Sequence, residues 1–168
     1  IQEVEECKIE KKYPSTLKIQ LLIRQPWVVV ANKGDTFFID RKGKIIYPMN
    51  KSIPVFTKVE NLSVSNGEVV EKDFWKLKTL KEIEDGSNVI NLPKYVNLEK
   101  IIIFDKNEIL ISGDNKKIMV SEDNISEKFK LLKLILEENV QNQKNWKYID
   151  MRFESPSIKY FNETDKLP

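Results

Sequence analysis

The chain has 168 residues, and its 28 Lys and Arg residues nearly balance its 26 Asp and Glu residues, which leaves a formal net charge of +2. So small a charge argues against a dedicated nucleic-acid-binding protein. Hydrophobic residues make up 40% of the sequence and aromatic residues 10%, enough to fill the core of a folded domain. The longest apolar stretch, residues 27–31, is far too short to span a membrane.

Two residue counts exclude whole classes of chemistry. The chain has no histidine, which excludes nucleophile–histidine catalysis and every site in which histidine binds a metal ion. It has one cysteine, Cys7, so neither an intrachain disulfide nor a cysteine-based zinc site can form. We therefore expect no catalytic, cofactor-binding or metal-binding site.

The N-terminal quarter predicts strands. Every second residue in 17–23 is apolar, which is the period of a strand with one apolar face. Those residues are Leu17, Ile19, Leu21 and Ile23. Residues 4–10 predict a weaker partner strand with a bulge, and the Tyr-Pro-Ser-Thr stretch at 13–16 predicts the turn of a hairpin.

A meander and a first helix follow the hairpin. Strands are predicted at 27–31, 36–39 and 44–47, connected by polar turns at 32–35 and 40–43, and residues 52–57, which contain Pro54, are interpreted as an edge segment or loop. A helix is predicted at 71–84, with the Asp-Gly-Ser stretch at 85–87 as its stop.

The C-terminal half predicts three strands, a helix and a final strand. The three strands are at 100–104, 108–112 and 116–120. The helix starts near Asp123 or Ser126, where side-chain oxygens can cap it, and carries Phe129, Leu132, Leu136 and Val140 on one stripe. The last strand covers 147–153, with 158–161 as its continuation. This order predicts an α+β fold, a mainly antiparallel sheet with the helices on one face.

Acidic residues offer little evidence of catalysis. Glu5-Glu6, Glu137-Glu138 and Asp114 each lack a neighbouring titratable group that the sequence shows to be buried, so we interpret them as solvated. A calcium loop starting at Asp105 fails because Leu110 occupies the position that requires glycine. Composition and spacing alone therefore indicate an α+β domain that is not an enzyme.

Taken together, several segments resemble the FtsQ/DivIB cell-division family. Residues 9–19 contain the family's aromatic-Pro-x-x-Leu-x-Ile hairpin, and Arg24-Gln25-Pro26-Trp27 is similar to its Arg-x-Pro-hydrophobic exit. Four later matches are Phe38-Ile39-Asp40-x-x-Gly43-x-Ile45, Ile53-Pro54-Val55, residues 117–120 together with 124–136, and the closing Tyr148-Ile149-Asp150-Met151-Arg152-Phe153. Ser121-Glu122 and Pro156 depart from the family pattern.

The resemblance implies three regions. Residues 1–25 correspond to the C-terminal hairpin of a POTRA domain, 26–161 to the family's β domain, and 162–168 to a tail. The helices that normally cover the hairpin lie upstream in the family, as does the membrane helix, so we expect the apolar face of the hairpin to be partly uncovered here.

The resemblance also implies function. Such proteins are non-catalytic scaffolds at the division septum, anchored in the plasma membrane with their domains on its extracytoplasmic side. They bind the division proteins FtsB/DivIC and FtsL and help to regulate septal peptidoglycan synthesis. We expect no nucleic-acid partner, and a homo-oligomer is not required. The alternative is an extracytoplasmic enzyme or substrate-binding module of similar architecture, which a deep pocket with convergent carboxylates would favour.

The resemblance places the partner-binding site at the C-terminal strand, where a partner adds a strand to the sheet edge. By alternation Ile149, Met151 and Phe153 should face the core, and Tyr148, Asp150 and Arg152 should share the other face. The expected contact residues are Phe153, Ser155, Ser157, Ile158, Tyr160 and Lys106. Matching positions on the hairpin, Ile9 and Lys11, are expected to act in recruitment to the division site.

Overall fold

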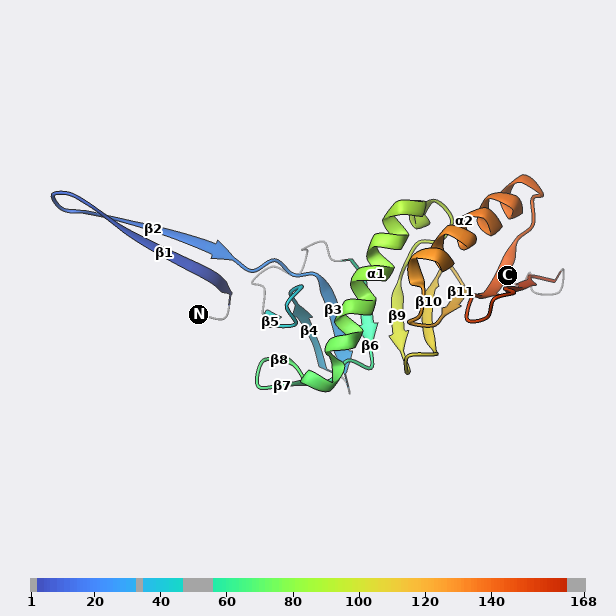
Figure 1. Cartoon of the computed structure of the whole chain (residues 1–168), viewed down its shortest axis with the longest axis horizontal. Coiled ribbons are helices and arrows are strands. Elements are labelled where there is room, and N and C mark those ends of the chain that lie inside the picture. The colour runs from blue at the N-terminus through green and yellow to red at the C-terminus, as the bar shows by residue number, and fades with distance from the viewer. Residues whose placement is uncertain (1–2, 33–34, 47–55, 163–168) are drawn as a thin grey trace.

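A nine-stranded sheet forms the centre of the computed structural model, which describes residues 3–32, 35–46 and 56–162 (Figure 1). Five of its strand pairings are antiparallel and three are parallel, which confirms the predicted α+β class. Across the sheet the order is β13 (Ser157–Tyr160), β12 (Trp146–Asp150), β11 (Lys116–Val120), β10 (Ile109–Gly113), β9 (Lys100–Ile103), β6 (Lys58–Glu60), β3 (Val28–Asn32), β4 (Asp35–Ile39) and β5 (Ile45–Ile46).

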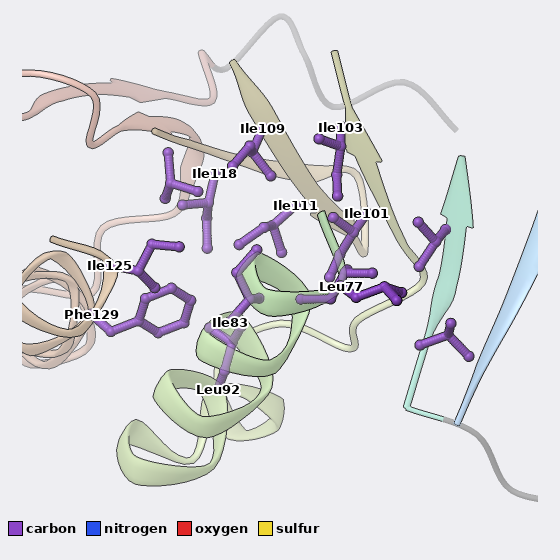
Figure 2. Close-up of a cluster of buried hydrophobic side chains, with 14 of the residues drawn as sticks. Leu77, Ile83, Leu92, Ile101, Ile103, Ile109, Ile111, Ile118, Ile125 and Phe129 are labelled. Atoms are coloured by element: carbon purple, nitrogen blue, oxygen red, sulfur yellow. The ribbon is translucent and has the colours of Figure 1, made fainter. Parts of the chain in front are cut away.

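Both α-helices, α1 (Phe74–Ile90) and α2 (Ile125–Gln141), pack on the same face of this sheet. Figure 2 shows Ile83 of α1 and Phe129 of α2 meeting isoleucines of β9, β10 and β11 in one apolar core. In the described part of the chain no helix lies on the other face, which we call the open face. Short elements flank α1: β7 (Val64–Ser65), β8 (Glu68–Val69), and the 3-10 helices Glu71–Asp73 and Leu92–Lys94.

The predicted hairpin extends away from the sheet (Figure 1). It consists of β1 (Val4–Lys12) and β2 (Thr16–Ile23), and the expected bulge lies between Val4 and Glu6. Every residue of β2 is exposed, so its apolar face is uncovered in the described structure, as expected.

Ionic contacts fix the base of the hairpin to the sheet. Arg24, just after β2, lies 2.6 Å from the carboxylate of Asp40, and both side chains are largely buried. Lys42 lies 2.6 Å from Glu5 of β1. A cleft of about 520 Å³ lies between the base of the hairpin and the sheet, and Trp27 is part of its lining. The orientation of the hairpin therefore depends on paired charges beside a partly apolar cleft.

The predicted end of the first helix was wrong. Helix α1 continues through residues 85–87 to Ile90 and ends at Asn91, which takes a left-handed conformation with φ 52°. Gly86 is buried mid-helix, where a Cβ atom would lie 2.7 Å from the ring of Phe129. The glycine therefore permits close contact between α1 and α2 rather than stopping the helix.

Three other expectations need correction. Strand β6, which follows residues 52–57 and lies in the middle of the sheet, was not predicted; it has only three residues. In α2, Val140 was predicted on the apolar stripe but is 60% exposed, and Asn139 is buried instead. Asn124 precedes this helix, and its side chain does not cap it.

Some predicted segments lie outside the described residues. They are the turn residues 33–34, Tyr47, residues 52–55 with Pro54, and the tail from 163 onward.

Replacing Gly86 with alanine tests the contact between the helices. We expect Gly86→Ala to lower the free energy of unfolding by about 1–2 kcal/mol, because overpacking against Phe129 exceeds the gain in helix propensity. Urea denaturation measures this change. The control is Asp85→Ala at an exposed position of the same helix, which should not destabilise the protein. A Gly86→Ala variant more stable than wild type would show that the helices do not pack closely here.

Candidate functional site

Strand β13 is the edge of the sheet, and β12 is an interior strand. β12 pairs in parallel with β11 and antiparallel with β13, whereas β13 pairs with β12 alone in the described structure. The prediction that 158–161 continue the final strand was therefore wrong, since the chain reverses at residues 151–156. The prediction that this segment forms a sheet edge is confirmed for Ser157–Tyr160.

The carboxylate of Asp150 organises the reversal. It accepts hydrogen bonds from the backbone N–H of Arg152 at 3.1 Å, from Arg152 Nε at 3.0 Å and Nη2 at 2.7 Å, and from the hydroxyl of Tyr148 at 3.0 Å. Asp150 is only 6% exposed. The predicted shared face of Tyr148, Asp150 and Arg152 is thus a connected network, which holds the chain where β12 ends.

The network shifts the ionisation of its members. Hydrogen bonds from Arg152 hold the pKa of Asp150 below its ordinary value, against the opposing effect of burial. Burial raises the pKa of Tyr148, and its hydrogen bond to Asp150 raises it further. At neutral pH the site therefore contains a carboxylate, a guanidinium and a protonated phenol, an arrangement suited to holding a turn.

The expectation that Phe153 faces the core was wrong. Ile149 and Met151 are buried as predicted, but Phe153 is 65% exposed. Strand alternation ends at Asp150, because the turn redirects the backbone and leaves the Phe153 ring outside. The guanidinium carbon of Arg152 lies 5.5 Å from the centre of that ring, so the aromatic group is flanked by a positive charge.

The backbone of β13 leaves donors and acceptors facing outward. The N–H of Phe161 donates to the carbonyl of Asn145 beside β12, so backbone groups at every second residue, including Lys159, point inward. Those of Ile158 and Tyr160 point away from the sheet. Two residues before Ile158 is Pro156, which has no N–H to donate. The first outward-facing N–H of this segment is therefore that of Ile158.

Of the other expected contact residues, Ser155 lies in the turn before β13, and Ser157, Ile158 and Tyr160 lie on the strand itself. Ser155 and Ser157 are exposed, and Ser157 pairs with Asp150. Ile158 and Tyr160 are partly buried against the core, where Tyr160 is opposite Trp146. The ammonium of Lys144 lies 5.5 Å from the centre of the Tyr160 ring. The structure thus brings these residues to one edge.

Lys106 lies at the end of the sheet where β12 ends, in the connection between β9 and β10. Its ammonium is 3.3 Å from the carboxylate of Glu122 and 5.5 Å from the Trp75 ring centre. The carbonyl of Lys106 also accepts a hydrogen bond from the N–H of Glu122. Lys106 is therefore paired within the chain, and among the described residues no hydrogen bond or ion pair joins it to β13.

The two expected recruitment residues are on the hairpin. Ile9 pairs with Ile19 and is 62% exposed, so it is not a core residue in the described structure. The ammonium of Lys11 lies 5.7 Å from the centre of the Tyr13 ring. Figure 1 places the hairpin and the orange-red strands before residue 163 at opposite ends of the molecule. Ile9 and Lys11 would therefore belong to a second surface.

Within residues 3–32, 35–46 and 56–162, no group of three or more acidic or cysteine side chains is placed to hold a metal ion. Neither α-helix has the length and the apolar character needed to cross a membrane.

Replacing Asp150 with asparagine tests the network. Because the pKa of Asp150 is lowered on folding, its stabilising effect is complete above the ordinary carboxyl pKa of about 4 and is lost as pH falls through the lower folded value. We expect Asp150→Asn to lower the free energy of unfolding by about 1–3 kcal/mol at pH 7 and to flatten its dependence on pH below about 4. Denaturation at several pH values measures both effects. The control variant Asp85→Asn removes an exposed charge and should keep wild-type stability at pH 7. If the free energy of unfolding of Asp150→Asn depended on pH below about 4 as strongly as that of the wild type, the Asp150 carboxylate would not be stabilised by this network.

Comparison with known proteins identifies the family. The family model described as cell division protein FtsQ/DivIB, C-terminal, matches residues 28–152, which is more than half of the chain. The match starts at the first residue of β3 and ends at Arg152, so the hairpin and β13 lie outside it. A search of curated proteins found no matching sequence. The chain belongs to the FtsQ/DivIB family of cell division proteins.

Proposed function

We propose that this protein is a non-catalytic scaffold of the divisome that binds FtsB/DivIC-like and FtsL-like proteins and so helps to regulate septal peptidoglycan synthesis. Family membership supports the role in cell division. Its place of action would be the extracytoplasmic side of the plasma membrane at the septum. The observation that carries the proposal is the edge strand β13, whose outward backbone groups at Ile158 and Tyr160 can accept a partner strand.

The two edges of the sheet differ in a way that supports this choice. At the β5 edge, Lys44 forms a bridge with Glu68, and the N–H of Ile45 donates to the carbonyl of Gly67 at 2.8 Å. The β7–β8 segment thus covers that edge. No described segment covers β13. An uncovered edge strand is a template for another chain, and its four residues fit a short partner strand.

Phe153 would serve as the aromatic anchor beside that edge. The Asp150 network holds the turn, and the turn presents the ring to solvent next to Arg152. Trp, Tyr and Arg side chains are enriched among the residues that dominate the binding energy of protein interfaces. An aromatic ring buries a large area at a low cost in conformational entropy. The contact surface would also include Ser155 and Ser157. Lys106, in the connection between β9 and β10, would contribute from farther away.

The alternative of an enzyme or substrate-binding module finds less support. Three carboxylates, those of Glu5, Asp40 and Glu84, line the cleft at the base of the hairpin. Each is already paired with a basic side chain, Lys42, Arg24 and Arg41 respectively. The three carboxylates in this lining therefore have basic partners that join the base of the hairpin to the sheet, which supports a structural role for them.

The proposed regions extend this function to the rest of the chain. Residues 1–25 would be the last hairpin of a POTRA domain, 26–161 the β domain and 162–168 a tail. The uncovered face of the hairpin fits a module whose covering elements are elsewhere. Ile9 and Lys11 would then contribute to recruitment to the septum.

Truncating Phe153 tests the anchor. We expect Phe153→Ala to weaken binding of the extracytoplasmic part of the FtsB/DivIC-like partner by about 30-fold or more, which corresponds to about 2 kcal/mol. Thermal stability should be unchanged, since the ring is exposed. Titration calorimetry measures the affinity. The matched control is Phe74→Ala, which removes a 49% exposed ring on α1 and should bind normally. Equal affinity of Phe153→Ala and wild type would remove Phe153 from the site.

Removing one outward N–H tests strand addition. Tyr160→Pro lacks the donor and places a ring toward the partner, whereas Tyr160→Ala loses the same side chain and keeps the donor. We expect the proline variant to bind at least about ten-fold more weakly than the alanine variant. Circular dichroism melting curves of both variants check that the fold is retained. Equal affinities of the two variants would contradict binding through the backbone of β13.

A further inference from the structure

We propose that the strand which adds to β13 carries an acidic residue opposite Lys159, flanked on each side by apolar residues. This inference rests on the proposed function and specifies the chemistry of the partner strand. It follows from the side chains that β13 presents on the two faces of the sheet.

The open face carries a row of cationic side chains that reaches β13. Lys117 of β11 is opposite Tyr148 of β12, and Tyr148 is opposite Lys159 of β13. Two strand spacings separate the lysines, or about 10 Å. Both lysines are exposed, and neither forms an ion pair in the described part of the chain.

The nearest strand carboxylate on this face does not neutralise these lysines. Asp150 lies in the neighbouring row, opposite Met119 and Ser157, and is engaged by Arg152 and Tyr148. Farther along the sheet, Lys100 and Lys58 share Glu60 at 3.4 and 3.8 Å. Neither Asp150 nor Glu60 therefore supplies a counter-charge to Lys117 or Lys159.

The backbone alternation makes the position next to Lys159 the most selective one. Because the backbone groups of Lys159 point inward, an antiparallel partner strand would face it in a non-hydrogen-bonded pair. Such pairs bring the two side chains closest together, so an acidic residue is favoured and a basic one is repelled. Lys117 adds to the positive potential from two strands away.

The neighbouring positions select for apolar residues. Ile158 and Tyr160 turn their side chains toward the core face, where they pack against the core. Partner residues opposite them would extend the same apolar layer. The strand that fits is therefore apolar–acidic–apolar, with its acidic side chain on the open face.

Charge reversal at Lys159 tests this inference, with the extracytoplasmic part of the FtsB/DivIC-like protein as the probe. We expect Lys159→Glu to weaken binding about ten-fold, and Lys159→Gln about three-fold with a weaker dependence on NaCl concentration. The control, Lys81→Glu, makes the same charge change at an exposed position of α1 and should bind as wild type. Changing each acidic residue of the probe to lysine in turn should reveal one that restores binding to Lys159→Glu.

The outcomes separate this inference from the proposed function. If Tyr160→Pro abolishes binding while Lys159→Glu binds like Lys81→Glu, strand addition stands and the acidic position is wrong. If Tyr160→Pro binds like Tyr160→Ala, strand addition itself fails and the inference fails with it. Binding of inorganic polyphosphate that depends on Lys159 and is unaffected by Tyr160→Pro would assign the lysines to a polyanion and overturn the proposal.

Discussion

The buried carboxylate of Asp150 is the group on which the candidate site depends. It accepts hydrogen bonds from the hydroxyl of Tyr148, two residues earlier, and from the backbone N–H and guanidinium of Arg152, two residues later. These bonds fix the point at which the chain leaves β12. Once the chain reverses there, β13 must return antiparallel, and its pairing with β12 sets which backbone groups face outward. The exposed position of Phe153 has the same origin.

The two edges of the sheet differ, since a neighbouring segment covers β5 and no described segment covers β13. A sheet with two free edges would associate indiscriminately, but here the β5 edge is closed by the β7–β8 segment through bonds at Ile45 and Val69. At β13 the proline at 156 and the charged side chain of Lys159 restrict what can be added. An edge that is open, short and restricted is suited to one specific strand rather than to aggregation.

Much of the fold follows from local patterns in the sequence. Alternation located the strand around Ile19, because side chains of a strand point alternately to two faces whatever lies beyond. The strands around Ile101 and Ile118 were located as short apolar runs between polar turns. The network of Tyr148, Asp150 and Arg152 was also foreseen as a shared face. By contrast, Gly86 indicated the end of a helix when only neighbouring residues were considered. Its role is to let the ring of Phe129 pack against α1, and that contact joins residues far apart in the chain.

The other errors have the same physical cause. Alternation predicted a buried Phe153 because it assumes a continuing strand. The hydrogen bond from the backbone N–H of Arg152 to the carboxylate of Asp150 instead holds a turn that ends the strand. Strand β6 has too few residues for a pattern, and its place between β3 and β9 depends on parallel pairing across long connections. Free backbone groups at Ile158 and Tyr160 follow from the register with β12, which the sequence does not display.

Residue-resolved amide hydrogen exchange, measured with and without the FtsB/DivIC-like partner, tests the central claim that a partner adds to the backbone of β13. We expect the amide of Lys159 to be protected already in the free protein, because it points toward β12, and the amides of Ile158 and Tyr160 to exchange quickly. Partner binding should then protect Ile158 and Tyr160 strongly. If the partner binds and these two amides still exchange quickly, the edge of β13 is not where it binds.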